Sequence, residues 1–136
     1  MSNTITKTIR QSGDRNHIVD VYILGDGSGE ETDTVLIDFS AIANAYGYTD
    51  LALTKYISSL TGFSCNLAWD ASTNVPFLEI PEGDSGFDYT MVGGPLNDNS
   101  GTGKTGDVNI TTVGLGSGDR GTIRLEFKKH NGALVV

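Results

Sequence analysis

The segment at residues 101–105, with the sequence Gly-Thr-Gly-Lys-Thr, has residue types that can hold a phosphate group. In a phosphate-binding loop, glycines let backbone N–H groups close around the phosphate while a lysine neutralises its charge. That loop also requires a glycine five residues before the one that precedes the lysine, and this sequence has Asp98 there. The charge of Asp98 would repel phosphate, and no strand before the segment or helix after it is predicted. We therefore interpret the segment as a glycine-rich turn.

Acidic side chains gather in two other segments. The first group is Asp26, Glu30, Glu31 and Asp33, together with Ser28. Oxygen ligands of this kind suit Ca²⁺, but their spacing is not that of a helical calcium loop, so we favour a solvated hairpin tip. The second group is Asp84, Asp88, Asp98 and Asp107. Aspartate commonly accepts hydrogen bonds from nearby backbone N–H groups, which predicts turn caps. We expect no metal site and no cofactor.

The histidines and the cysteine are the remaining candidates for catalysis. His17 and His130 are each far in sequence from a paired ligand or nucleophile, and we expect both at the surface near strand ends. Cys65 alternates along a strand with Leu67 and Trp69, which predicts a small buried side chain. A triad of Cys65, His130 and an aspartate stays open as an alternative. We cannot assemble a nucleophile, a base and an orienting group from this chain, so we expect that it is not an enzyme.

Several apolar side chains are candidates for contacts with other molecules. The aromatic candidates, which lie among glycines and polar residues, are Tyr46, Tyr48, Phe87 and Tyr89. For these four residues, the sequence favours an interface role and local packing about equally. Ile5 and Ile9 share one face of the N-terminal strand and complete the set of interface candidates. Trp69 is expected in the core.

Length, charge and cysteine content limit the kind of protein. The chain has 136 residues, enough for one domain with one core. Its formal net charge of −8 opposes binding to nucleic acid and to anionic membranes. Its apolar runs are too short to span a bilayer, and its start lacks the apolar stretch of a signal peptide. Cys65 is the single cysteine, so no internal disulfide forms. We expect synthesis in the cytoplasm.

The elements that position these residues are strands. Alternating apolar and polar residues recur along the chain, and no window shows a helical stripe over three turns. The predicted strands are 4–11, 17–24, 34–40, 50–60, 63–70, 75–81, 107–113 and 121–129. Residues 50–60 are ambiguous between helix and strand, and we interpret them as strand. Turn residues at 25–29, 71–74 and 114–119 predict hairpins.

The remaining segments complete the predicted organisation. Residues 1–8 form an extended N-terminal arm, and the polar, glycine-rich residues 82–104 form a long surface loop. Together these elements predict an all-β fold, with residues 1–136 as a single-domain β-sandwich or partly closed β-barrel of about eight or nine short strands.

The second half of the chain resembles a known group of proteins. The relevant segments are 67–75, 87–96, 105–114 and 118–129. They contain a strand ending in Trp69-Asp70, an aromatic segment followed by Gly93-Gly94, a Thr-Gly-Asp strand start and a final Gly-Asp connection to a strand ending in lysines. This run resembles small virion structural proteins of tailed bacteriophages, of the capsid decoration or cement type.

The resemblance implies a mechanical role. Such proteins bind the major capsid protein on the capsid exterior, often as homotrimers, and stabilise the head against internal pressure. The alternatives are another phage structural component of the tail, neck or head fibre, or a carbohydrate-binding β-sandwich module that uses Tyr46, Tyr48 or Trp69 as stacking platforms.

Overall fold

The structure is a computed structural model, and it describes residues 3–13, 15–42, 47–91 and 94–130. The strands are β1 (Thr4–Ser12), β2 (Asn16–Leu24), β3 (Thr34–Ile37), β4 (Asp50–Thr61), β5 (Ser64–Trp69), β6 (Val75–Ile80), β7 (Gly83–Asp88), β8 (Leu96–Asn97), β9 (Val108–Val113) and β10 (Arg120–His130). Two short 3₁₀ turns, η1 (Phe39–Ala41) and η2 (Tyr89–Met91), follow β3 and β7. Neither described helical turn is long and apolar enough to cross a membrane.

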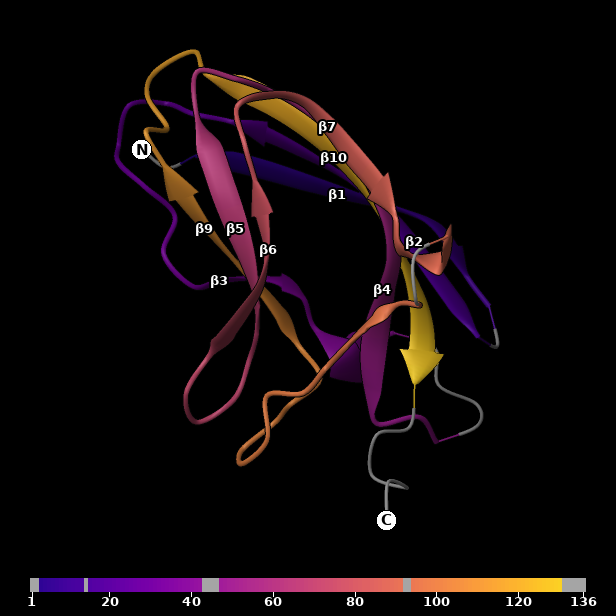
Figure 1. Cartoon of the computed structure of the whole chain (residues 1–136). Coiled ribbons are helices and arrows are strands. Elements are labelled where there is room, and N and C mark those ends of the chain that lie inside the picture. The colour runs from indigo at the N-terminus through magenta and orange to yellow at the C-terminus, as the bar shows by residue number, and fades with distance from the viewer. Residues whose placement is uncertain (1–2, 14, 43–46, 92–93, 131–136) are drawn as a thin grey trace.

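The strands form two antiparallel sheets that pack face to face (Figure 1). Sheet A has the order β1-β2-β10-β4-β7, with β8 also paired to β4. Sheet B has the order β3-β9-β5-β6. The predicted all-β class is confirmed, and of the two expected architectures the sandwich is the one found. The ambiguous segment 50–60 is a strand, β4, as predicted.

Alternation along the strands explains the core between the sheets. In β2, Val19, Val21 and Ile23 are buried, while the residues between them face the outside of sheet A. In β5, Cys65, Leu67 and Trp69 are fully buried. Successive side chains of a strand point to opposite faces, so one apolar set from each sheet meets in the middle. The core roles predicted for Cys65 and Trp69 are confirmed.

Two of the three predicted hairpins are wrong. The turn at 71–74 joins the paired strands β5 and β6, as expected. However, β2 and β3 lie in different sheets, as do β9 and β10. Stacked sheets are about 10 Å apart, a gap that a glycine-rich connection of several residues crosses easily. These two connections also bond to each other, because Gly25 N–H donates to Asp119 O and Gly118 N–H donates to Gly25 O.

Two predicted irregular segments contain regular structure. Residues 4–8 of the expected arm belong to β1, which pairs with β2 along its length. Residues 82–104 are not one loop, because β7, η2 and β8 lie within them. The sequence of β7 has only one large apolar residue, Phe87, so its strand character comes from backbone pairing with β4 rather than from a visible alternation. The expected strand 34–40 is also shorter, because Asp38 caps η1.

Candidate functional site

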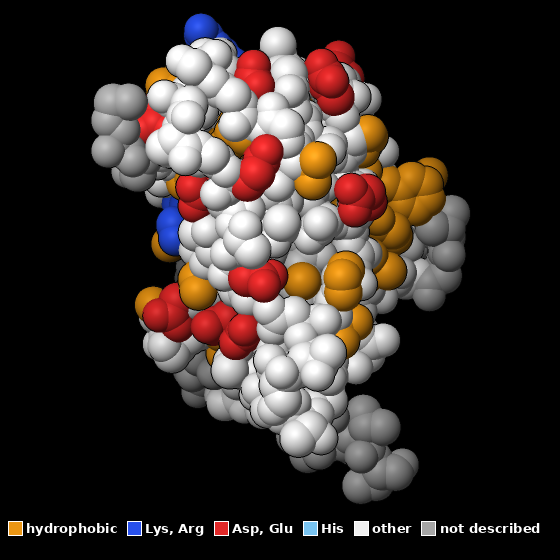
Figure 2. Space-filling view, turned by 90° about the vertical axis from the view of Figure 1, so that its left-hand side faces the viewer, with side chains coloured by type: hydrophobic (Ala, Val, Ile, Leu, Met, Phe, Trp, Pro, Cys, Tyr) orange, Lys and Arg blue, Asp and Glu red, His pale blue; other side chains and the backbone are white. Residues whose placement is uncertain are grey.

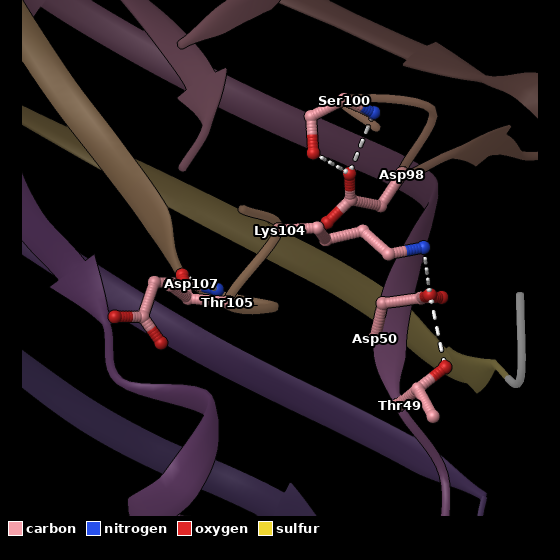
Figure 3. Close-up of polar contacts among 7 residues, drawn as sticks. All are labelled: Thr49, Asp50, Asp98, Ser100, Lys104, Thr105 and Asp107. Atoms are coloured by element: carbon pink, nitrogen blue, oxygen red, sulfur yellow. Dashed lines mark hydrogen bonds and ion pairs between the residues drawn. The ribbon is translucent and has the colours of Figure 1, made fainter. Parts of the chain in front are cut away.

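The glycine-rich loop at 101–105 lies across the start of β4 (Figure 3). Lys104 N–H donates to Gly101 O, which confirms the predicted turn. The Lys104 ammonium group does not point outward, since its Nζ lies 2.8 Å from Oδ2 of the buried Asp50. Thr49 Oγ1 donates to the same carboxylate over 3.1 Å. Lys104 is therefore part of an ion pair that holds the glycine-rich turn on sheet A.

Asp98 stands beside this ion pair and serves a local turn. Its Oδ1 accepts from the backbone N–H and the hydroxyl group of Ser100, at 3.0 and 2.6 Å (Figure 3). Its Oδ2 is buried with no hydrogen-bond partner among the described residues, and burial raises the pKa of the carboxyl group. Asp88 caps its turn in the same way through Thr90. The predicted capping role is confirmed for Asp88 and Asp98, whereas Asp107 instead accepts from the distant Phe39 N–H.

The acidic segment at 26–33 is tied to the rest of the protein. Glu30 accepts from Thr112 Oγ1, Gly114 N–H and Leu115 N–H, and these bonds lower the pKa of its carboxyl group. Glu31 accepts from Asn3 Nδ2 over 2.8 Å. The segment thus connects the two sheets and is held in place by these hydrogen bonds, whereas a hairpin tip was expected. Within the described ranges, no group of three or more histidine, cysteine or acidic side chains is placed to hold a metal ion.

His17 is buried, so its expected surface position is wrong. Its Nδ1 lies 3.0 Å from Ser12 Oγ, and Lys129 Nζ lies 3.4 Å from the same hydroxyl group. Burial, followed by the charge of Lys129, lowers the pKa of His17. Sequence spacing did not reveal this cluster because its members come from β1, β2 and β10. Both His17 and Lys129 are buried, so we interpret the cluster as a structural link between these strands. The side chain of His130 lies outside the described part.

Two large exposed apolar residues, Phe87 and Met91, lie at the β7 edge of sheet A. The Phe87 and Tyr89 rings meet edge to face, with centroids 4.9 Å apart, and 45% of Phe87 is exposed. Met91, in the next turn, is 80% exposed. Ile57 is 52% exposed on β4 and lies opposite Gly86 of β7. Phe87 pairs with the buried Tyr56, so the side chains of Phe87 and Ile57 point to opposite faces of sheet A. We call Phe87, Tyr89 and Met91 the apolar flank.

The other interface candidates lie elsewhere. Tyr48 and Ile5 pack against the core as partly buried side chains. Ile9 is 57% exposed on β1, at the opposite edge of sheet A. Tyr46 lies outside the described residues. Of the five candidates that the structure describes, it therefore brings together only Phe87 and Tyr89. Met91 and Ile57 were missed because an isolated apolar residue in a predicted strand or loop is more often assigned to packing.

A groove of about 890 Å³ runs along the outer face of sheet A. Short side chains such as Thr6, Thr8 and Ser59 line it, together with Tyr22 and Ile57. Asp20 bridges Arg10 and Arg124 there, with both Nε–Oδ distances at 2.7 Å. Hydrogen bonding from Arg124, and then from Arg10, lowers the pKa of Asp20 to about 2. Asp20, Arg10 and Arg124 in the groove are thus paired with one another.

Trp69 is not available as a stacking platform. Its ring is fully buried and stacks on Phe77, with centroids 3.8 Å apart. Phe87 of the apolar flank is an exposed aromatic side chain, and Tyr22 in the groove is a half-buried one.

Comparison of the chain with protein families, with characterised proteins and with solved structures gave no match.

Proposed function

We propose that this chain is a non-catalytic structural protein that binds the outside of a tailed-phage capsid lattice through the apolar flank. The observation that carries the protein-binding part is the flank itself. Phe87 and Tyr89 are in ring contact at one sheet edge, Met91 lies in the same short turn as Tyr89, and Met91 is 80% exposed. Exposed apolar patches of this kind are typical of protein-interaction sites. The assignment to a capsid rests on the resemblance of residues 67–129 to decoration proteins.

The surroundings of the flank support a protein partner. Asp84 and Asp88 of β7 and Lys55 of β4 lie along the same edge. An apolar centre with a charged rim is the usual composition of a protein interface. In a phage, such contacts across capsid subunits would stabilise the head, because a ligand that binds only the assembled lattice shifts the equilibrium toward assembly.

The first test is reconstitution. Purified protein is mixed with expanded capsids that lack it, and co-sedimentation and the temperature of particle disruption are measured. We expect saturable binding and a higher disruption temperature. The Phe87→Ser/Met91→Ser variant should bind at least about tenfold more weakly, whereas Val113→Ser should bind normally. Val113 is a matched control because it is 56% exposed but lies on β9 in sheet B. Equal binding by all three proteins would contradict the flank as the contact.

A second candidate function follows from the groove of sheet A. Hydroxyl-bearing side chains and the half-buried Tyr22 line an open groove, a composition that suits neutral sugars. A glycan array tests this candidate, with Tyr22→Ala as the variant expected to lose any signal. Glycan binding without capsid binding would replace the capsid proposal with a carbohydrate-binding one. Binding to isolated tails instead of capsids would indicate another virion position.

A further inference from the structure

Basic residues are distributed unequally between the two sheets. The chain has nine lysines and arginines, and none of them lies in β3, β5, β6 or β9 of sheet B. Figure 2 shows the outer face of sheet B with acidic side chains across it and basic ones only at its margins. Sheet A, in contrast, carries lysines and arginines on β1, β4 and β10. The two sheets therefore present different charges to a neighbour.

One side of the sandwich has two free strand edges. Among the described strands, β1 pairs only with β2, and β3 pairs only with β9. The two edges lie on the same side of the molecule, because Asn3, just before β1, donates to both Gly29 O and Glu31 Oε2, just before β3. Free edges offer unpaired backbone N–H and C=O groups to another chain.

These two edges are complementary in charge. β1 contains Lys7 and Arg10 and no acidic residue. Residues 30–38, which include β3, contain four acidic residues and no basic one. Arg10 shares Asp20 with Arg124, so that group as a whole keeps a positive charge. Each edge also carries one exposed apolar residue, Ile9 on β1 and Val35 on β3, with 57% and 47% of their surfaces exposed.

Charge also decides which edges can meet. If the β1 edges of two molecules met, Lys7 and Arg10 of one molecule would face the same cations of the other. If two β3 edges met, the four carboxylates of each molecule would face one another. Both arrangements are repulsive, whereas β1 against β3 is attractive. Lysine and a bulge on an edge strand discourage indiscriminate strand addition, and β1 has Lys7 and a bulge between Ile9 and Gln11. The charges of β1 therefore favour pairing with an acidic strand edge.

We propose that a second copy of this chain binds to this side, with β1 of each copy against β3 of the other. Because both edges lie on one side, a single twofold axis forms both contacts at once. The inference goes beyond the capsid proposal and does not depend on it, since the apolar flank lies at the opposite edge of sheet A. It differs from the homotrimer that the family resemblance implies.

The test is the mass of the protein in solution, measured by sedimentation and by light scattering at micromolar concentrations. We expect a dimer, with twice the 14.4 kDa of one chain, that weakens as salt is added. Lys7→Glu/Arg10→Glu should raise the dissociation constant at least about tenfold. Arg120→Glu/Lys128→Glu makes the same charge change at exposed positions of β10, which lies inside sheet A, and should leave the dimer intact.

A mixing experiment separates the edge contact from a loss of folding. Asp33→Asn/Val35→Lys/Asp38→Asn removes two acids and adds a cation at the β3 edge. Asparagine suits the positive φ of 48° at position 33 and keeps the capping acceptor at position 38. Each multiple variant alone should be monomeric. Mixed together they should dimerise, because one unaltered β1–β3 contact remains in the mixed pair.

Dimers in the wild type and in the mixture, but not in either variant alone, support the proposal. A wild-type protein that stays monomeric, a trimer, or a dimer that survives Lys7→Glu/Arg10→Glu overturns it. Capsid binding is measured with the same variants, so that a failure of the dimer proposal and a failure of the capsid proposal can be told apart.

Discussion

Lys104 Nζ lies 2.8 Å from Oδ2 of Asp50, and the Asp50 side chain is fully buried at the start of β4. The pair joins the glycine-rich loop to the start of β4 in sheet A. A buried carboxylate in a protein interior is costly unless a cation and hydrogen bonds compensate its charge. The lysine is therefore a structural residue, although its surroundings in the sequence resemble part of a nucleotide-binding loop.

We predict that Lys104→Met destabilises the protein by about 2–4 kcal/mol, since it removes the ammonium group that neutralises Asp50. Urea unfolding at pH 7 measures this change. Lys128→Met, at an exposed position on β10, should cost less than about 0.5 kcal/mol. The double variant Asp50→Asn/Lys104→Met should recover part of the loss. An unchanged midpoint for Lys104→Met would show that the pair contributes no stability.

Asp20 should make stability depend on acid pH. Because its pKa is lowered from 3.8 to about 2 in the folded protein, its contribution is full above about pH 5 and is lost as the pH falls through 2 toward about 1. The side chain is 28% exposed, so solvent limits the contribution to about 1 kcal/mol. Asp20→Asn should therefore be less stable than the wild type at pH 7, and the difference should shrink steadily as the pH is lowered below about 4. Asp84→Asn, on the same sheet, serves as the control in the same urea titrations.

Cys65 should react with thiol reagents only after unfolding. Its side chain is fully buried, and burial, with a smaller effect of Glu79, raises the pKa of the thiol to about 12. The thiolate is the reactive form, so both access and ionisation are suppressed in the folded protein. Absorbance after addition of a disulfide reagent should rise immediately in urea and only slowly in buffer. Rapid labelling of the folded protein would contradict the packing described for β5.

Two glycines with similar backbone angles should tolerate alanine differently. Gly106 and Gly118 have φ of 85° and 84°. A Cβ atom at Gly118 meets nothing within 4 Å, whereas at Gly106 it would lie 2.8 Å from Cγ of Phe39. Gly118→Ala should cost about 1 kcal/mol, from backbone strain alone. Gly106→Ala adds a clash with a core ring and should cost about 1–3 kcal/mol more. Thermal and urea unfolding of both variants test the difference.

The fold class was predictable because period-two alternation is strong in the central strands. Val19, Val21 and Ile23 in β2, and Cys65 with Trp69 in β5, are buried as that pattern predicts. The choice of partner strand was not predictable, because a glycine-rich connection looks the same whether it turns back within one sheet or crosses to the other. β7 was missed for a related reason, since its pairing with β4 needs no apolar side chain.

The candidate site was predictable only in part. Phe87 and Tyr89 were candidates because they lie among glycines and polar residues, although the sequence favoured an interface role and local packing about equally. In the structure Phe87 is exposed, and Tyr89 is partly buried against the core. Met91 and Ile57 gave no such signal. The burial of His17 and the ion pair of Lys104 depend on contacts between residues far apart in the chain. No local pattern in the sequence contains that information.

The position of β10 sets the order in which this protein can fold. β10 lies between β2 and β4 in sheet A, yet it is the last of the described strands to leave the ribosome. A nascent chain that ends before residue 120 has the β1–β2 hairpin and β4, but not the strand that joins them. Strand pairings between distant residues form slowly, because the chain must close large loops first. Sheet A is therefore completed only after synthesis of β10, and until then the inner edges of β2 and β4 remain open to the wrong partners.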